Sequence, residues 1–329
     1  MLDRKDHSHP KTPLQYLRLF FTGFAMGAAD LVPGVSGGTM AFILGIYEDL
    51  IDGIKSFNLE AVRLALGLKF GALLEHVPLR FLIALGLGIG TAILLLASAL
   101  SATLDDPDGR VLLFAFFFGL VIASIVAIGT KVKWSLLTGV ALVVGTVVAF
   151  AIVNAVPAVV EPTPVNLFIA GMIAICAMIL PGISGSFILL IMGQYNNVLS
   201  AVSNRDFVTV GIVGVGCVVG IVIFSRVLSW LLKHYYQPTV AALVGFMVGS
   251  LWKVFPWKIC TIEGVDRHGE AVCLYDTNYL PAVDSNVIIA IGLMLLGFVL
   301  VSFLDHLQSG SNPLFSLFWR RSQVAAEPQ

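Results

Sequence analysis

Charged residues are scarce in this sequence. Only 12% of the 329 residues are Asp, Glu, Lys or Arg, whereas 58% are hydrophobic, and the mean hydropathy is +0.94. A soluble domain of this size could not keep so much apolar surface out of water. The 19 basic and 20 acidic residues give a formal net charge of -1, without the basic excess that attracts nucleic acid. The composition therefore predicts an integral membrane protein and argues against nucleic acid as a partner.

Metal-ligating residues are also few, and we expect neither a metal ion nor another cofactor. The six histidines lie in tails and loops without the spacing of a metal site: His7, His9, His76, His234, His268 and His306. Of the four cysteines, Cys176 and Cys217 lie within apolar stretches, where cysteine acts as a small core residue. Cys260 and Cys273 flank a turn-like sequence at 266–269, and a disulfide across a small hairpin is expected there.

Long apolar runs fill most of the remaining chain. Six of them approach the roughly 20 residues that cross a hydrocarbon core: 81–104, 111–128, 134–153, 207–225, 236–252 and 285–304. Two further apolar stretches, 19–46 and 165–193, are longer, and a Pro-Gly sequence interrupts each of them in the middle. Proline removes a backbone donor and glycine adds conformational entropy to the unfolded chain. The sequence therefore predicts two broken helices in addition to six ordinary spans.

The two interruptions belong to an internal repeat. When the chain is shifted by about 150 positions, PGVSGG at 33–38 aligns with PGISGS at 181–186. A smaller offset, which allows for a longer charged loop in the first half, aligns Gly119 with Gly245. Each half therefore consists of one broken element followed by three spans.

The distribution of Lys and Arg indicates that the broken elements turn back within the membrane. Cytoplasmic flanks are enriched in these residues. If both elements are re-entrant and the N-terminus is cytoplasmic, only Arg110, Arg205, Lys253, Lys258 and Arg267 lie outside, whereas two fully crossing elements divide the basic residues almost equally. A topology with only the first element re-entrant gives the same charge bias. The repeat argues against that topology, because two halves with one sequence pattern should share one local fold.

The predicted fold is an all-α polytopic membrane protein of two inverted repeats, each a re-entrant helical hairpin followed by three transmembrane helices. Its parts are a cytoplasmic tail at 1–18, a first repeat at 19–156 with a cytoplasmic amphipathic segment at 52–78, a second repeat at 165–304 with an extracytoplasmic loop at 253–284, and a cytoplasmic tail at 305–329. The segment 52–78 is expected to be a helix on the membrane surface. A helix from Gly37 to Ile46, roughly 15 Å long, would place the first break near mid-depth of a core of roughly 30 Å.

Each interruption has the features of an anion site. A helix that begins inside the membrane presents unpaired N–H groups and the positive end of its dipole, while glycines leave room for a ligand and hydroxyls add donors, as a phosphate group requires. The candidate phosphate ligands are Ser36, Gly37, Gly38, Thr39, Ser184, Gly185 and Ser186. Alternatively, each sequence is only a packing kink, since Gly and Ser also serve close helix contact. The duplication favours a site, as does the rule that non-helical backbone in a membrane lines a cavity.

Three ionisable residues near these sequences are further candidates. Asp30 is the only ionisable residue between Leu19 and Ile46, and an intramembrane carboxylate is usually functional. It is a candidate for proton or cation coupling, or else a structural acceptor for the amides of the bend. Glu48 is a second coupling or gating candidate at the membrane edge, where a solvated helix end is the simpler interpretation. Arg205, on the expected outer face, is a candidate for attracting an anionic headgroup, although a lone interfacial arginine more often sets topology.

The two Pro-Gly sequences and their flanks resemble a bacterial membrane protein family. PGVSGGT at 33–39 and PGISGS at 181–186, with MGAADLV at 26–32 leading in and ILGIYEDL at 43–50 leading out, are similar to the family once described as domain of unknown function 368 and now as polyprenyl-phosphate transporters. The resemblance covers nearly the whole chain. It implies a flippase, not an enzyme, that returns undecaprenyl phosphate from the outer to the cytoplasmic leaflet of the bacterial plasma membrane. The mechanism we expect is alternating access, in which the half-repeats rock around a mid-membrane phosphate site.

Two other functions stay open. Membrane undecaprenyl-diphosphate phosphatases also contain inverted re-entrant hairpins, and one of their motifs is similar to PGxSRSxxT. Here Gly37 and Gly185 stand at the arginine position, so the charge that would stabilise a transferring phosphoryl group is missing. A secondary transporter of a small soluble anion shares every physical feature considered above. The residues also leave open the coupling ion and the oligomeric state, a homo-oligomer included.

Overall fold

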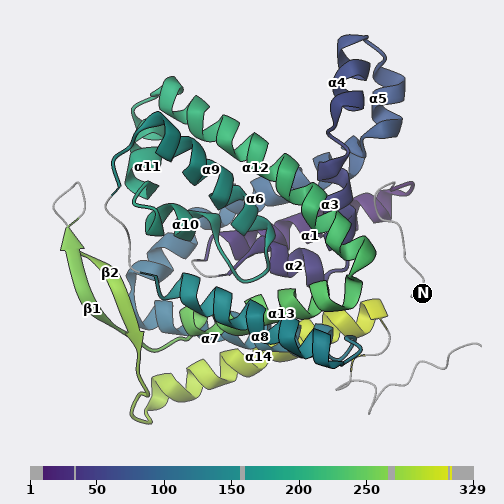
Figure 1. Cartoon of the computed structure of the whole chain (residues 1–329). Helices are drawn as coiled ribbons and strands as arrows, with labels where there is room; N and C mark the ends of the chain where they lie inside the picture. The colour runs from purple at the N-terminus through teal and green to yellow at the C-terminus, as the bar shows by residue number, and fades with distance from the viewer. Residues whose placement is uncertain (1–9, 33–34, 156–159, 266–270, 310–311, 313–329) are drawn as a thin grey trace, which may run out of the picture.

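A computed structural model describes residues 10–32, 35–155, 160–265, 271–309 and 312 (Figure 1). The first half of the chain forms α1 (Pro13–Asp30), α2 (Gly37–Ile43), α3 (Tyr47–Lys55), α4 (Leu59–Leu66), α5 (Phe70–His76), α6 (Leu79–Asp105), α7 (Pro107–Gly129) and α8 (Leu136–Val153). The second half forms α9 (Pro164–Ile179), α10 (Gly185–Ile191), α11 (Tyr195–Ser203), α12 (Phe207–His234), α13 (Tyr236–Val254), β1 (Lys258–Val265), β2 (Ala271–Asn278) and α14 (Ser285–Ser309).

The six predicted membrane spans are all helices in the structure, namely α6, α7, α8, α12, α13 and α14. Within the described residues, each of these except α13 is both long enough and apolar enough to cross a membrane. The bounds of the two cytoplasmic tails stay a prediction. α1 begins at Pro13, because Thr12 and Gln15 form a capping box, and α14 continues to Ser309. The chain is therefore a multi-pass membrane protein.

Both long apolar stretches are broken where the Pro-Gly sequences predicted. α1 ends before the first of them and α2 begins after it, and α9 and α10 are separated in the same way; residues 33–34 themselves lie outside the described part of the chain. α2 and α10 have seven residues each, about 10 Å of helix. The predicted ten-residue helix from Gly37 is wrong, because Gly45 and Gly193 adopt positive φ values of 71° and 66° and end the short helices.

The segment 52–78 is divided between the end of α3 and two short helices, so the prediction of one amphipathic helix is wrong. Asn58 starts α4 by accepting hydrogen bonds from the N–H groups of Glu60 and Ala61, and Leu68 interrupts the chain after α4 with a φ of 54°. α4 and α5 pack chiefly against each other and project from the body at the top right of Figure 1. They and their connections expose large apolar side chains: Leu59, Val62, Leu66, Leu68, Phe70 and Leu74. Contact with the membrane surface stays a prediction.

The loop at 253–284 contains an antiparallel hairpin, as expected from Cys260 and Cys273, and the described chain outside it fits the predicted all-α class. β1 and β2 pair from Lys258 opposite Asn278 to Val265 opposite Ala271, and the turn between them lies outside the described residues. The hairpin stands at the left of Figure 1. Cys260 and Cys273 form a disulfide bond across it, with an S–S distance of 2.06 Å. That this loop is extracytoplasmic stays a prediction.

Helix packing follows the repeat and also joins the two halves. Within each half, α1 packs along α6 and α9 packs along α12, whereas α7 pairs with α14 and α8 pairs with α13 across the halves, forming a bundle at the bottom of Figure 1. The two glycines that the repeat matches, Gly119 and Gly245, lie at equivalent contacts between the halves. A side chain at Gly119 would meet the backbone of Met294 in α14, and one at Gly245 would meet the backbone of Leu142 in α8. This reciprocity supports a two-fold relation between the halves, while their inverted orientation in the membrane stays a prediction.

Candidate functional site

Ser36 and Thr39, which follow the first Pro-Gly sequence, contact the chain at the second Pro-Gly sequence directly. Residues 33–39 are named here the first motif, and residues 181–186 the second motif. The Ser36 hydroxyl donates to backbone carbonyls at the end of α9, those of Met178 at 3.2 Å and Leu180 at 3.3 Å. In return, the Gly182 N–H donates to Oγ1 of Thr39 at 3.1 Å. Ser36 and Thr39 therefore form a polar contact with the segment from Met178 to Gly182, far away in the sequence.

The amides of Gly37, Gly38 and Thr39 in the first motif are already bonded within the protein. The Gly37 N–H donates to Oδ1 of Asp30 at 2.6 Å, and the Gly38 N–H donates to Oγ of Ser36 at 3.1 Å. The Thr39 N–H donates to the Ser36 carbonyl at 2.9 Å. A carboxylate at the positive end of α2 is favourable both as a hydrogen-bond acceptor and as an anion. In this conformation Asp30 has the structural role that the sequence left open, and it stands where an anionic ligand of α2 would bind.

Space around the first motif is too small for side chains at its glycines. A Cβ on Gly37 would collide with the Asp30 carboxylate, and a Cβ on Gly38 would collide with the carbonyl of Ile179. Ser36 and Thr39 are both fully or almost fully buried. The glycines are therefore required for the close approach of α1, α2 and α9.

The second motif differs from the first in how its donors are used. Oγ of Ser184 lies 2.7 Å from Oγ of Ser186, and the described residues supply no side-chain cap for α10. Ser184 is buried, whereas Ser186 is exposed. Met178 occupies the position that Asp30 has in the first half, so α10 lacks the matching carboxylate. The hydroxyls of the second motif therefore bond to each other, whereas those of the first motif bond to backbone groups across the contact.

Tyr47 was not among the predicted site residues. It is buried at the start of α3, its hydroxyl donates to the Ile179 carbonyl at 3.2 Å, and its ring packs on Phe42 with a centroid distance of 4.9 Å. The repeat aligns Tyr47 with Tyr195, but Tyr195 is 37% exposed. The shared tyrosine was visible in the sequence, whereas the burial of only one copy against α9 depends on how the halves meet.

The remaining predicted residues lie outside the contact between the motifs. Glu48 is in the first turn of α3 and partly buried. Arg205 is exposed in the turn between α11 and α12, with a φ of 56°. The structure thus brings Asp30 to the motifs and leaves Arg205 at the surface.

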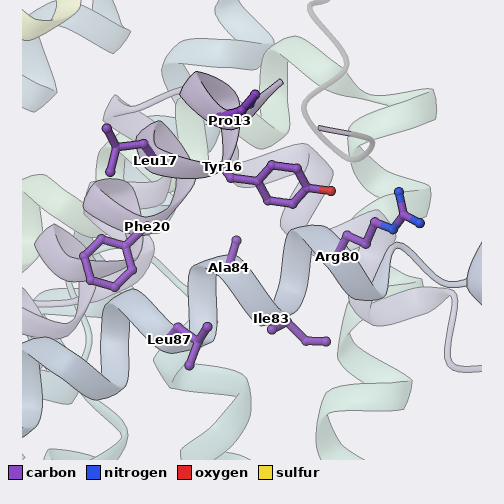
Figure 2. Close-up of a pocket in the computed structure, with 8 residues that line it drawn as sticks. All are labelled: Pro13, Tyr16, Leu17, Phe20, Arg80, Ile83, Ala84 and Leu87. Carbon is purple, nitrogen blue, oxygen red and sulfur yellow. The ribbon is translucent and has the colours of Figure 1, made fainter. Parts of the chain in front are cut away.

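An apolar groove of about 670 Å³ lies between α1 and α6 (Figure 2). It is lined by Pro13, Tyr16, Leu17, Phe20, Arg80, Ile83, Ala84 and Leu87. The Arg80 guanidinium is the one cation among these lining residues, and the Tyr16 hydroxyl points to the same side of the groove in Figure 2. Sequence reasoning did not find this groove, because its walls come from two helices whose packing partners it could not assign.

The fold and the joined motifs define a multi-pass membrane protein with two broken helices that meet at a polar contact. A family model described as VCA0040-like, undecaprenyl phosphate translocase-like, matches residues 26–272. The chain belongs to this family, and the resemblance drawn from the motifs is confirmed.

Two curated relatives are similar to the chain over most of their length. A polyprenyl-phosphate transporter of Vibrio cholerae serotype O1 is 40% identical over 300 residues, which cover 89% of this chain and 97% of the relative. A polyprenyl-phosphate transporter of Staphylococcus aureus is 35% identical over 259 residues, which cover 71% of this chain and 84% of the relative. No solved structure matches the chain. The family membership supports a role in lipid transport.

Proposed function

We propose that this protein is a flippase that returns undecaprenyl phosphate, or a related polyprenyl phosphate, from the outer to the cytoplasmic leaflet of the bacterial plasma membrane. The observation that carries the proposal is the direct contact between the two motifs. A phosphate monoester on a long apolar tail requires polar donors within the membrane and a route open to lipid. Two broken helices that meet inside an apolar protein supply such donors.

The phosphate is held, in this proposal, by hydroxyls and amides of the two motifs: Ser36, Gly37, Gly38, Thr39, Ser184, Gly185 and Ser186. In the conformation described, the Asp30 carboxylate already accepts from the Gly37 N–H, so the lipid phosphate and Asp30 compete for the same donor. Neutralising Asp30 with a proton or a cation would weaken that bond and free the amide. Asp30 thereby couples ion binding to phosphate binding.

We propose that the moving parts are smaller than the two half-repeats. Because α7 pairs with α14 and α8 with α13, each half is packed into the other. We propose instead that these four helices are the fixed frame, and that α1 to α6 on one side and α9 to α12 on the other move against it. This division would open the contact between the motifs to each leaflet in turn.

The experiment that tests the function uses purified protein in sealed liposomes that contain a polyprenyl phosphate. The accessibility of the headgroup in each leaflet is followed over time, and release of inorganic phosphate from the polyprenyl diphosphate is measured in the same preparation. Headgroup movement without phosphate release is expected. Phosphate release would instead indicate a phosphatase. If neither headgroup movement nor phosphate release is seen, the remaining candidate substrate is a small soluble anion.

The serine hydroxyls of the motifs should contribute to headgroup affinity. In the variant with both Ser36→Ala and Ser184→Ala we expect the dissociation constant for a polyprenyl phosphate to rise by roughly thirtyfold, since each of the two hydroxyls contributes about 1 kcal/mol. Ser203→Ala is the matched control, because its hydroxyl only donates to the Leu199 carbonyl on exposed α11. Unchanged affinity in the double variant, measured by titration in detergent, would exclude the proposed hydroxyl contacts.

A further inference from the structure

Two lysines share one carboxylate where the hairpin meets α13. Nζ of Lys253, in the last turn of α13, lies 3.0 Å from Oδ1 of Asp276 on β2. Nζ of Lys258, on β1, lies 3.4 Å from Oδ2 of the same carboxylate and donates to the Lys253 carbonyl at 2.6 Å. The lysine side chains are only 20% and 14% exposed. One negative charge therefore faces two positive charges that are largely withdrawn from water.

Among the residues that the structure describes, the charges around this cluster leave it positive. Burial lowers the pKa of Lys258 to about 8; Asp276 opposes that shift, while Lys253 and Arg110 of α7 add to it. Burial would raise the pKa of Asp276, but the two lysines hold it below its ordinary value, so the carboxylate is ionised at neutral pH. Burying an excess of like charge is costly unless a further counter-ion joins it. A bound anion would supply that counter-ion.

The cluster adjoins the second motif. Ser250 and Lys253 are three residues apart and share one face of α13. A side chain at Gly182 would collide with Ser250, and Nζ of Lys253 lies 5.1 Å from the ring centroid of Phe187, which directly follows the second motif in α10. One face of α13 thus runs from the bend of the second motif to the lysines.

An apolar groove of about 360 Å³ lies beside the same lysines. It is lined by Phe118, Leu251, Trp252, Phe255, Asn278, Tyr279 and Leu280. Nζ of Lys258 is 5.6 Å from the ring centroid of Phe114, and Phe118 is one helical turn further along α7 on the same face. The Phe114 ring that faces Lys258 and the groove residue Phe118 are therefore one turn of helix, roughly 5 Å, apart along α7.

We propose that Lys253 and Lys258 form a headgroup subsite for the phosphate monoester of the substrate lipid, with the groove at Phe118 holding the first isoprene units of its tail. This inference rests on the proposed function, because the proposed function supplies the identity of the lipid. The charge complementarity and the adjoining groove suit an amphiphile with an anionic head. The hairpin, which the Cys260–Cys273 disulfide bridges, holds Lys258 and Asp276 against α13. The subsite adjoins the second motif, so a headgroup bound there could pass directly to it.

The test measures the binding of farnesyl phosphate, a soluble short-chain analogue, to the full-length protein in detergent. Lys253→Gln and Lys258→Gln should each raise its dissociation constant by roughly tenfold, while the binding of neutral farnesol stays unchanged. Lys133→Gln, an exposed lysine before α8, is the matched control. Inorganic phosphate should compete at least about tenfold more weakly than farnesyl phosphate, because it cannot use the groove; equal competition would overturn the role of the groove.

The pH dependence separates a binding role from a structural one. The phosphate is already mostly a dianion above its second pKa of about 6. Affinity should therefore fall as the pH rises through about 8, where Lys258 loses its proton. Lys258→Arg should keep the affinity and abolish this fall. At neutral pH, Asp276→Asn should bind farnesyl phosphate at least as tightly as the unmodified protein, because a competing anion is removed.

Two outcomes would overturn the subsite. The first is that the lysine variants bind farnesyl phosphate as tightly as the unmodified protein. The second is that Asp276→Asn loses binding in parallel with the lysine variants, because a purely structural cluster would give that pattern. These outcomes differ from a failure of the proposed function, which is an absence of headgroup movement in liposomes by the unmodified protein.

Discussion

Replacing Asp30 by asparagine is expected to slow polyprenyl-phosphate transport by about tenfold, the equivalent of about 1.4 kcal/mol. The amide oxygen of asparagine can still accept the hydrogen bond from the Gly37 N–H, so the bend between α1 and α2 should be retained. What the variant loses is the negative charge, and with it the ability to bind a proton or a cation. Transport by Asp30→Asn should therefore also lose its dependence on pH or on the coupling cation, measured as headgroup movement in liposomes.

Asp30→Ala is the companion variant, because it removes both the charge and the acceptor. It should lose transport and also stability, since the first N–H of α2 then has no side-chain acceptor. Full transport with unchanged pH dependence in Asp30→Asn, combined with loss of stability only in Asp30→Ala, would restrict Asp30 to a structural role. The pair of variants thus separates the two roles that the sequence left open.

Leucine at Gly119 or at Gly245 is expected to destabilise the protein by about 3 kcal/mol or more. At each position the new side chain would be placed against the backbone of the facing helix, Met294 of α14 or Leu142 of α8, and backbone cannot move aside as a side chain can. The midpoint of thermal unfolding in detergent should fall by roughly 5 to 10 °C, and the fraction of monodisperse protein should fall with it. Because the repeat matches the two glycines, the two effects should be similar.

Gly139→Leu is the control for this experiment. Gly139 lies in α8, and a Cβ added there has nothing within 4 Å, so the variant should unfold at the temperature of the unmodified protein. Strong destabilisation by Gly119→Leu with none by Gly245→Leu would contradict the reciprocal packing of the halves.

The transmembrane helices and the two breaks could be predicted from the sequence, whereas the packing of the helices could not. Apolar length marks the six spans, and the chemistry of Pro-Gly marks the two breaks, because both signals are local. Helix partners are not local properties. Nothing in the run that became α7 indicates α14 as its partner rather than α8, since both are strongly apolar. The divided segment at 52–78 and the early ends of α2 and α10 depended on single positions, Leu68, Gly45 and Gly193, whose positive φ values are not implied by composition.

The candidate site could be predicted in its residues but not in its bonding. The repeat identified the two motifs, and the structure joins Ser36 to Met178 and Thr39 to Gly182. Whether the Asp30 carboxylate would be free or bonded to the amide of Gly37 depended on distances that no spacing gives. In the sequence, Lys253 and Lys258 served only to assign the sides of the membrane. Their low exposure could not be predicted, because it requires the hairpin to fold back onto α13.

The exchange of partners between the halves also affects how the protein is made. α7 and α8 are synthesised well before α14 and α13, the helices against which they pack. Their glycine-lined faces therefore have no packing partner until the other end of the chain has been made. Contacts this distant in sequence form slowly. During that interval the first half is an unfinished protein that exposes close-packing surfaces to lipid. The same pairing that holds the mature bundle together therefore makes its assembly depend on completion of the last helix.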